Sequence, residues 1–347
     1  MIDILLSTYN GEAFLKEQLD SILNQTYKDF KLIIRDDVST DSTVDIITDY
    51  VHKYPSEILY INGVYYKNMD NRIGGGDKNN NGNEKGHLGF NLSYNELLKY
   101  STSDYIMFAD QDDMWLPKKI EISIGRIKEL EKKFPDKPIL VHSDLTVVNK
   151  DLKIIESSFF KYIRINPSKN SLNGLIMQNT VTGCTMIINK SLVDIAIPLT
   201  EEVFFYDYWL ALVAKIFGII DTINEPLILY RQHDSNVIGA GANNIRKLLK
   251  KISIIKDLYR QGCLLYKRYY NYNDSNNKGL KSHYKMILKS FVEIGSANPI
   301  KRLYIIFKYK FFRQGFKRNL AIVLGAILFK NELIKIKTEY CLKKLNS

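Results

Sequence analysis

Cysteine is scarce in this chain of 347 residues, and long apolar runs are missing. The three cysteines, Cys184, Cys263 and Cys341, are scattered and lack metal-ligand spacing. An odd, sparse set argues against a disulfide framework and suits a reducing cytoplasm, so we expect each thiol to act as a small buried hydrophobic group. No apolar run approaches the roughly 20 residues of a membrane-spanning helix. The apolar stretch at the N-terminus is only as long as a strand, so we expect no signal peptide.

Positive charge is the strongest compositional bias, with a formal net charge of +11 at pH 7. Such an excess requires an anionic partner or surface. No nucleic-acid-binding motif accompanies the charge, so we expect no nucleic acid partner. The excess is concentrated beyond residue 245, where residues 300–313 mix cations with large apolar side chains and an apolar run follows at 320–329.

The segment 241–347 is therefore predicted to be a basic, mainly helical region. Basic amphipathic helices lie in the membrane interface, where anionic lipid headgroups attract them. We expect this region to associate with an anionic membrane surface. The alternative is a helical subdomain whose apolar stripe packs on the rest of the protein.

Residues 106–117 hold the chain's most informative cluster, with Asp110, Asp112 and Asp113 directly after an apolar run that predicts a buried strand. Carboxylates packed this closely repel one another and raise each other's pKa unless a cation lies between them. Aspartates are ligands suited to Mg²⁺ or Mn²⁺, and Mg²⁺ usually shares its shell with substrate phosphates. The cluster indicates a metal-bound diphosphate site; the alternative is a solvated acidic turn that caps a helix starting near Pro117.

The first half of the chain opens with alternating strands and helices. Strands are predicted at residues 2–6 and 31–35, and helices at about 12–24 and from the turn at 38–42 to about residue 52. This order implies a parallel sheet with right-handed crossovers. Because ligands bind at the carboxyl ends of such strands, the polar clusters at 7–11, 36–37 and 110–113 should share one rim.

Three motifs stand out, namely Ser-Thr-Tyr-Asn-Gly at 7–11, Asp-Asp-Val-Ser-Thr-Asp at 36–41 and Ala-Asp-Gln-Asp-Asp-Met-Trp at 109–115. Together with the segment 14–27, they resemble motifs of the family 2 inverting glycosyltransferases. The last motif is similar to the metal-binding Asp-x-Asp region of these enzymes. The likeness covers about residues 1–240 and is greatest for the rhamnosyltransferase-like branch that builds bacterial O-antigens and capsules. Val38 departs from the pattern, because the family commonly has Gly or Asn there.

The resemblance implies a GT-A fold, an α/β architecture in which a Rossmann-like, mainly parallel sheet is flanked by helices. Residues 1–240 would form the glycosyltransferase domain, with a nucleotide-binding half at about 1–115 and an acceptor half at about 116–240. Residues 67–87 are rich in Asn, Gly, Asp and Lys, a composition that cannot bury enough apolar surface to order itself. We expect them to form a mobile insertion, with a lid over the donor site as a further role. The region from 241 would be a C-terminal helical extension.

The resemblance also assigns residues to the donor site. Ser7 and Tyr9 would line the base and ribose pocket, and Asp37 would bind the pyrimidine through its ring N–H. Asp112, helped by Asp110, would hold Mn²⁺ or Mg²⁺ on the diphosphate.

In the segment 229–236, related enzymes have a loop that covers the diphosphate. Arg231 could neutralise the leaving phosphates, and His233 could supply a third metal ligand. The alternative for His233 is an ordinary satisfied histidine.

The segment 204–214 is predicted to begin a helix with one acid among aromatic residues. In the family, the acid before this Trp-Leu-Ala stretch is the general base, which here is Asp207; the alternative is an N-cap. Tyr206 and Trp209 would stack on the acceptor sugar, unless they are core residues. A strand entered by a Gly turn is predicted at 181–188.

The predicted reaction is a single displacement with inversion. The donor would be dTDP-L-rhamnose, with UDP-galactose, UDP-glucose or a UDP-N-acetylhexosamine as alternatives. The acceptor would be a lipid-linked saccharide at the inner face of the bacterial membrane, which the cytoplasmic enzyme would contact peripherally. A nucleotidyltransferase is disfavoured because the segment 7–11 lacks a Gly-rich, basic phosphate loop. A membrane-recruited, non-catalytic scaffold would predict losses among the four aspartates Asp37, Asp110, Asp112 and Asp207, and all four are present.

Overall fold

The computed structural model describes residues 1–61, 87–200, 202–233, 245–276, 282–328 and 330–342. The expected insertion at 67–87 lies outside the described residues except for His87. The chain forms two compact units, each built from several segments. The first unit comprises Met1–Phe159, Gly183–Glu201 and Ile223–His233, and the second comprises Phe160–Thr182, Glu202–Thr222 and Asp234–Ser347.

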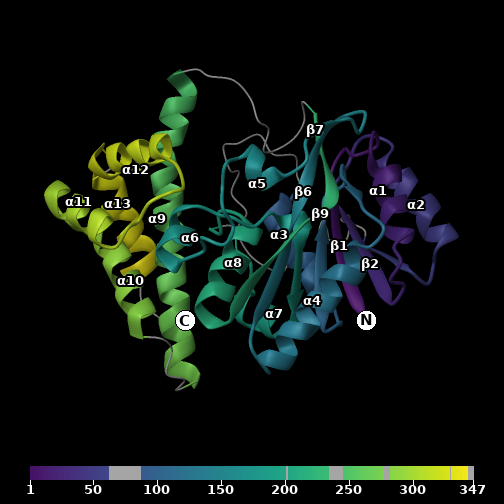
Figure 1. Cartoon of the computed structure of the whole chain (residues 1–347), viewed down its shortest axis with the longest axis horizontal. Helices are drawn as coiled ribbons and strands as arrows, with labels where there is room; N and C mark the ends of the chain where they lie inside the picture. Colours follow the sequence, from purple (N-terminus) through teal and green to yellow (C-terminus); the bar gives the residue numbers. More distant parts are fainter. Residues whose placement is uncertain (62–86, 201, 234–244, 277–281, 329, 343–347) are drawn as a thin grey trace, which may run out of the picture. The chain divides into compact units, whose positions relative to one another are not determined.

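The described strands form one nine-stranded sheet in the order β3-β2-β1-β4-β8-β6-β9-β5, with β7 paired to β6. The strands are β1 (Ile2–Thr8), β2 (Phe30–Asp36), β3 (Ile58–Ile61), β4 (Tyr105–Ala109), β5 (Met114–Trp115), β6 (Ile139–Asn149), β7 (Ile154–Glu156), β8 (Met186–Asn189) and β9 (Ile219–Gln232). The helices that belong to the first unit are α1 (Leu15–Leu23), α2 (Thr43–Lys53), α3 (Phe90–Tyr100), α4 (Lys119–Lys133) and α7 (Lys190–Ala196). Figure 1 shows helices flanking the sheet, as expected for an α/β fold.

Strands β3, β2, β1 and β4 are parallel, which confirms the expected β-α-β-α opening. The Ile, Leu and Met runs of β1, β2 and β4 are buried on both faces, which is typical of a parallel sheet covered by helices. Helices α1 and α2 cross over between these strands, and each begins within a few residues of the predicted position.

The other half of the sheet is antiparallel, because β8 runs against both β4 and β6, and β9 runs against β5. Two expectations need correction here. Residues 183–185 form a 3₁₀ turn, so the predicted strand at 181–188 begins only at Met186. Residues 229–232, expected as part of a loop, form the end of β9, because Leu229 pairs with Met114 and places this segment in the sheet.

The second unit is helical. Its elements are α6 (Leu172–Met177), α8 (Tyr206–Phe217), α9 (Ile245–Asn276), α10 (Ser282–Glu293), α11 (Pro299–Lys308), α12 (Phe316–Leu328), α13 (Lys330–Lys337) and a π-helical turn at Thr338–Leu342, and the short α5 (Phe159–Tyr162) falls at the boundary between the units. Arg302 is fully buried there, and its guanidinium donates to the carbonyl oxygens of Gly295, Ala297 and Ala326. This arginine therefore ties α11 to α12 and to the segment between α10 and α11.

Among the described residues, no helix combines the length and the apolar character that crossing a membrane requires. Cys184 and Cys263 are buried, as expected, whereas Cys341 is half-buried.

Candidate active site

The carboxyl ends of β1, β2 and β4 lie at one edge of the sheet. Thr8 is in register with Asp36, and Leu6 with Ala109, so the turn at 7–11, Asp37 and Asp110 follow neighbouring strands at the same edge. This arrangement confirms the predicted rim.

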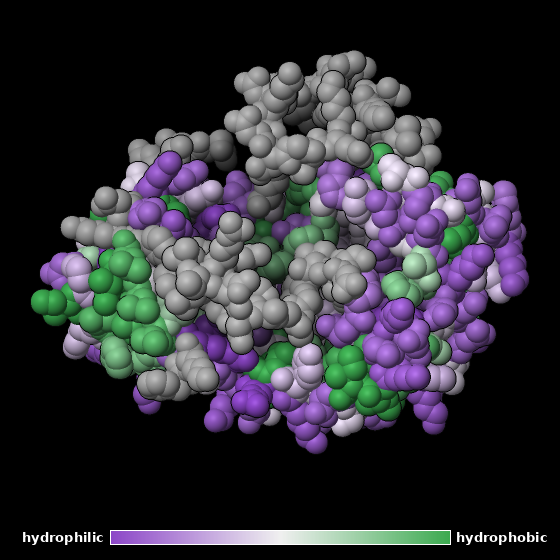
Figure 2. All heavy atoms as spheres, turned by 90° about the horizontal axis from the view of Figure 1, so that it is seen from above, coloured by the Kyte–Doolittle hydropathy of each residue, from purple (hydrophilic) through white to green (hydrophobic). Residues whose placement is uncertain are grey.

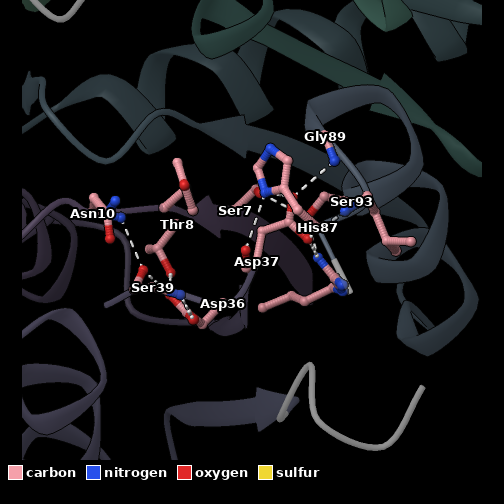
Figure 3. Close-up of polar contacts among 12 residues, drawn as sticks. Ser7, Thr8, Asn10, Asp36, Asp37, Ser39, His87, Gly89 and Ser93 are labelled. Atoms are coloured by element: carbon pink, nitrogen blue, oxygen red, sulfur yellow. Dashed lines mark hydrogen bonds and ion pairs between the residues drawn. The ribbon is translucent and has the colours of Figure 1, made fainter. Parts of the chain in front are cut away.

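Hydrogen bonds join the turns after β1 and β2 (Figure 3). Thr8 Oγ1 donates to Asp36 Oδ1 over 2.8 Å, and Asp36 Oδ2 accepts the amide of Ser39 over 2.8 Å. Asn10 donates its own amide to Ser39 Oγ over 2.8 Å and accepts the Thr40 amide through Oδ1. These reciprocal bonds hold the two turns together as one side of the site.

Val38 adopts a left-handed backbone conformation in the second of these turns, with φ of 69°. A β-branched side chain strains this conformation, whereas Gly adopts it freely and Asn tolerates it. The position where the chain departs from the family pattern is therefore one where the backbone itself favours Gly or Asn.

We expect Val38→Gly to raise the free energy of unfolding by about 1 kcal/mol, since relief of the left-handed strain outweighs the added chain entropy of glycine. Thermal unfolding of the two proteins measures the difference. An unchanged or lower melting temperature would show that the valine side chain contributes more through packing than it costs in strain.

The Asp37 carboxylate is the most heavily bonded group of the rim. It is 2% exposed, forms an ion pair with Arg35 Nη1 at 2.8 Å, and lies 2.9 Å from His87 Nδ1. It also accepts the amides of Leu88 and Gly89 at 2.9 and 2.8 Å (Figure 3). A base N–H can reach this carboxylate only if one of these donors moves.

Ser7 and Tyr9, the other expected base-pocket residues, flank the same group. Ser7 Oγ lies 2.6 Å from Ser93 Oγ, which also accepts a bond from Arg35 (Figure 3). The exposed Tyr9 ring lies 4.4 Å from the His87 ring, centroid to centroid. Sequence reasoning missed Arg35, His87 and Ser93, and it placed His87 at the end of the expected mobile insertion 67–87.

The loop after β4 is held by its neighbours on the rim. Gln111 receives the Tyr9 amide on Oε1 over 2.7 Å and returns a bond from Nε2 to the Tyr9 carbonyl over 2.9 Å. A Cβ on Gly11 would lie 2.5 Å from Gln111 Oε1, so any other residue at this position would force the Gln111 side chain to move. Gln18 Nε2 donates to the Asp110 carbonyl, which fixes the start of the loop.

Asp112 and the end of β9 form the centre of the site. His233 Nε2 lies 2.8 Å from Asp112 Oδ2. The buried Arg231 donates from Nε to the Asp112 carbonyl over 2.9 Å and pairs through Nη2 with Glu17. The structure therefore brings Asp110, Asp112, Arg231 and His233 together, although the last two are about 120 residues further along the chain.

Asp113 differs from the other two aspartates because it is fully buried. Burial first, and the charges of Asp112 and Asp110 second, hold the pKa of Asp113 well above its usual value. Its carboxylate accepts the Arg231 amide at 3.2 Å, so it ties β9 to the loop. Burial also lowers the pKa of Lys119, which interacts with the charge of Asp113, to about 7. The Lys119 ammonium group lies 4.1 Å from the Trp115 ring centroid.

Two sets of side chains compete as a metal site. Asp110, Asp113 and Cys184 place ligand atoms within 4.8 Å of one another. However, Cys184 is a buried thiol, and soft sulfur ligands suit Mn²⁺ and Mg²⁺ poorly. The half-buried Asp110, Asp112 and His233 offer oxygen and imidazole donors nearer to solvent, and they are a second set that could hold a divalent cation.

The charges around this set also fit a divalent cation. The carboxyl groups of Glu17, Asp110, Asp112 and Asp113 face two cations, Arg231 and Lys119. With one proton shared between Asp113 and Lys119, the group carries two more negative than positive charges. The alternative of an acidic helix cap is not supported, because α4 begins with Lys118 at the N-cap and has no side-chain cap bond.

Asp207 lies in the second unit, in the first turn of α8, with its Oδ1 accepting the Tyr208 amide at 2.6 Å. The N-cap of this helix is Phe205, not Asp207. Tyr206 and Trp209, expected to stack on a sugar, are 6% and 3% exposed, and the Arg268 guanidinium lies 5.9 Å from the Trp209 ring centroid. Their burial favours packing that holds α8.

Comparison with known proteins identifies the class. The model described as "Glycosyl transferase family 2" matches residues 3–85 and 82–195, more than half of the chain. The chain belongs to this family, and it is a glycosyltransferase that uses a sugar-nucleotide donor. The fold is the expected GT-A fold.

Two curated relatives are informative. The dTDP-rhamnosyl transferase RfbG of Shigella flexneri is 26% identical over 73% of this chain and 79% of its own length. The UDP-Glc:α-D-GlcNAc-diphosphoundecaprenol β-1,3-glucosyltransferase WfgD of Escherichia coli is 23% identical over 74% of this chain and 86% of its own length. Among solved structures, S. aureus TarS 1–349 in complex with UDP-GlcNAc matches with a TM-score of 0.55 and 17% identity, over 98% of this chain and 80% of that one.

Proposed function

We propose that this chain is a metal-dependent, inverting glycosyltransferase that moves L-rhamnose from dTDP-rhamnose to a lipid-linked oligosaccharide in O-antigen or capsule synthesis. The main evidence for metal dependence is that Asp110, Asp112, Arg231 and His233 lie together at the edge of the sheet where β1 and β4 end. The similarity to RfbG supports the choice of donor. UDP-glucose, UDP-galactose and a UDP-N-acetylhexosamine are the alternatives within the same reaction class, and WfgD is named for the first of them.

Asp110, Asp112 and His233 would hold Mn²⁺ or Mg²⁺. When bound, such an ion stabilises the negative charge that builds on a leaving diphosphate. Arg231 would add a fixed positive charge beside the phosphates, since Glu17, Asp113 and the Asp112 carbonyl already hold it in place. Ser7, Tyr9 and Asp37 would bind the base and ribose once one of the bonds from residues 87–89 to the Asp37 carboxylate has broken.

Asp207 would be the general base. An acceptor hydroxyl oxygen attacks the anomeric carbon from the face opposite the diphosphate, and its proton passes to the Asp207 carboxylate. The bond from the anomeric carbon to the phosphate oxygen breaks, and its electron pair leaves with the diphosphate. The first turn of α8 suits this role, because the positive end of the helix dipole favours an ionised carboxylate there.

The acceptor would be a saccharide on a membrane lipid, presented at the inner face of the bacterial membrane. The diphosphoundecaprenol acceptor in the name of WfgD supports this choice. The net charge of +11 supports peripheral contact with an anionic membrane surface. A membrane-recruited scaffold without catalysis is the competing function, and the joint presence of Asp112, Asp207, Arg231 and His233 argues against it.

The test is transfer to a short soluble acceptor analogue, followed by NMR of the product. We expect a new glycosidic bond whose anomeric configuration is opposite to that of the donor sugar. Retention of configuration would contradict the single displacement. Release of nucleoside diphosphate from the donor, without transfer of the sugar to the analogue, would show that the proposed acceptor class is wrong. It would still support the proposed donor site.

A further inference from the structure

Helix α11 has two apolar faces. Its buried face holds Ile305, Ile306 and the aliphatic part of Arg302, which pack inside the helical unit. Ile300, Tyr304 and Phe307 are spaced i, i+4 and i+7, so they form one stripe on the opposite side. These three side chains are 81%, 59% and 59% exposed, which is unusual for large apolar residues on a folded surface.

Helix α12 repeats this pattern. Ile322 and Ala326 are buried, whereas Leu320, Leu324 and Ile327 recur at i, i+4 and i+7 on the exposed side, with Leu328 beside them at 63% exposure. The two helices pack against each other within the second unit, and Arg302 bonds to the Ala326 carbonyl across their contact. Figure 2 shows hydrophobic side chains gathered at the end of the view where Figure 1 places α11 and α12.

The charge of this part of the chain identifies the kind of surface it fits. Residues 245–347 contain 24 Lys and Arg against 5 Asp and Glu, whereas residues 1–244 contain 25 against 33. The exposed Lys308 lies beside the stripe, with its ammonium group 5.2 Å from the Tyr304 ring centroid, and the exposed Lys310 follows. Exposed apolar side chains bordered by lysines match the boundary between acyl chains and anionic headgroups.

We propose that the exposed stripes of α11 and α12, named here the α11–α12 face, dock on an anionic lipid bilayer. The α11–α12 face consists of Ile300, Tyr304, Phe307, Leu320, Leu324, Ile327 and Leu328. The apolar side chains enter the interface, and the surrounding lysines contact phosphate headgroups. This inference rests on the proposed function, because docking would bring the enzyme to a lipid-linked acceptor, which is found only at such a surface.

Other occupants of the α11–α12 face fit less well. A second copy of the chain would bring two strongly basic regions together, and their charges would repel. Nucleic acid phosphates would be drawn to the lysines but would gain nothing from seven exposed apolar side chains. A bilayer with anionic lipids satisfies both features.

The test measures co-sedimentation of the full chain with vesicles of phosphatidylcholine and phosphatidylglycerol, and with vesicles of phosphatidylcholine alone. The face variant carries Ile300→Ser, Phe307→Ser and Leu328→Ser. The control variant carries Ile154→Ser and Ile155→Ser, two exposed apolar positions on β7. Because all of these side chains are exposed, we expect both variants to unfold at the temperature of the unsubstituted protein.

We expect the unsubstituted protein and the control to bind the anionic vesicles, with partial release in high salt. The face variant should bind at least about tenfold more weakly, because it loses apolar insertion and keeps its charge. Nucleotide-sugar hydrolysis should be equal in all three proteins, so a failed donor assay would count against the proposed function alone.

Three results would overturn the proposal. One is no vesicle binding by the unsubstituted protein. Another is equal binding by the face variant and the control. The third is a dimer in solution that only the face variant dissociates, which would make the α11–α12 face an interface between copies of this chain.

Discussion

Replacing Asp112 by Asn should lower metal-dependent turnover by at least about 100-fold while the protein stays folded. The substitution keeps the shape of the side chain but removes the charge that lies 2.8 Å from His233 Nε2 in the proposed ligand set. The side chain is half-buried at the sheet edge, so its loss removes little core packing. Initial rates over a range of Mn²⁺ concentrations measure the effect.

Asp49→Asn is the matched control for this variant. Asp49 is an exposed residue of α2, so the same change of charge there should leave turnover and metal dependence unaltered. Near-normal turnover of Asp112→Asn at low Mn²⁺ would remove Asp112 from the metal shell. The group of Asp110, Asp113 and Cys184 would then be the set to test next.

Replacing Asp207 by Asn should lower kcat by roughly 10²- to 10⁴-fold and leave donor affinity almost unchanged. The amide preserves the shape of the side chain but cannot accept the proton of the acceptor hydroxyl. Calorimetric titration with nucleoside diphosphate measures donor-site affinity, and steady-state kinetics with a soluble acceptor analogue measure kcat.

Donor hydrolysis gives this prediction a second readout. Water can replace the acceptor, so slow hydrolysis should also fall if Asp207 removes a proton from the attacking oxygen. If the variant instead loses affinity for the nucleotide and keeps its kcat, Asp207 binds the donor and the base lies elsewhere.

The parallel half of the fold could be predicted because its signals are local. The strands that end at Thr8, Asp36 and Ala109 are apolar runs, each followed at once by a polar turn. Parallel strands joined in this order place their carboxyl ends at one edge, so the rim followed from the order of elements alone.

The antiparallel half of the sheet, and how deeply each aspartate is buried, could not be predicted in this way. The end of β9 became a strand because Leu229 pairs with Met114, a contact between distant segments that no local pattern indicates. Asp112 and Asp113 are neighbours of the same residue type, and only packing against Cys184 and Arg231 buries the second of them. The partners of Asp37 at 87–89 were missed for the same reason.

The C-terminal helices show a further limit of sequence patterns. A stripe of apolar residues at helical spacing predicts a buried face, and α11 has one at Ile305 and Ile306. The same helix carries a second stripe through Ile300, Tyr304 and Phe307 that stays exposed. Only the structure separates the stripe that packs inside the protein from the one that is open to a partner.

The proposed function requires that this site bind a nucleotide-diphosphate sugar with a divalent metal and cleave it. Its most direct test is a hydrolysis screen that measures the nucleoside diphosphate released from dTDP-rhamnose, UDP-glucose, UDP-galactose and UDP-N-acetylhexosamines, with Mn²⁺ and with a chelator. We predict release of dTDP from dTDP-rhamnose above that from the other donors, lost on chelation and lost in Asp112→Asn. Release from no donor, together with no metal-dependent thermal stabilisation by dTDP or UDP, would contradict the claim and favour the non-catalytic scaffold.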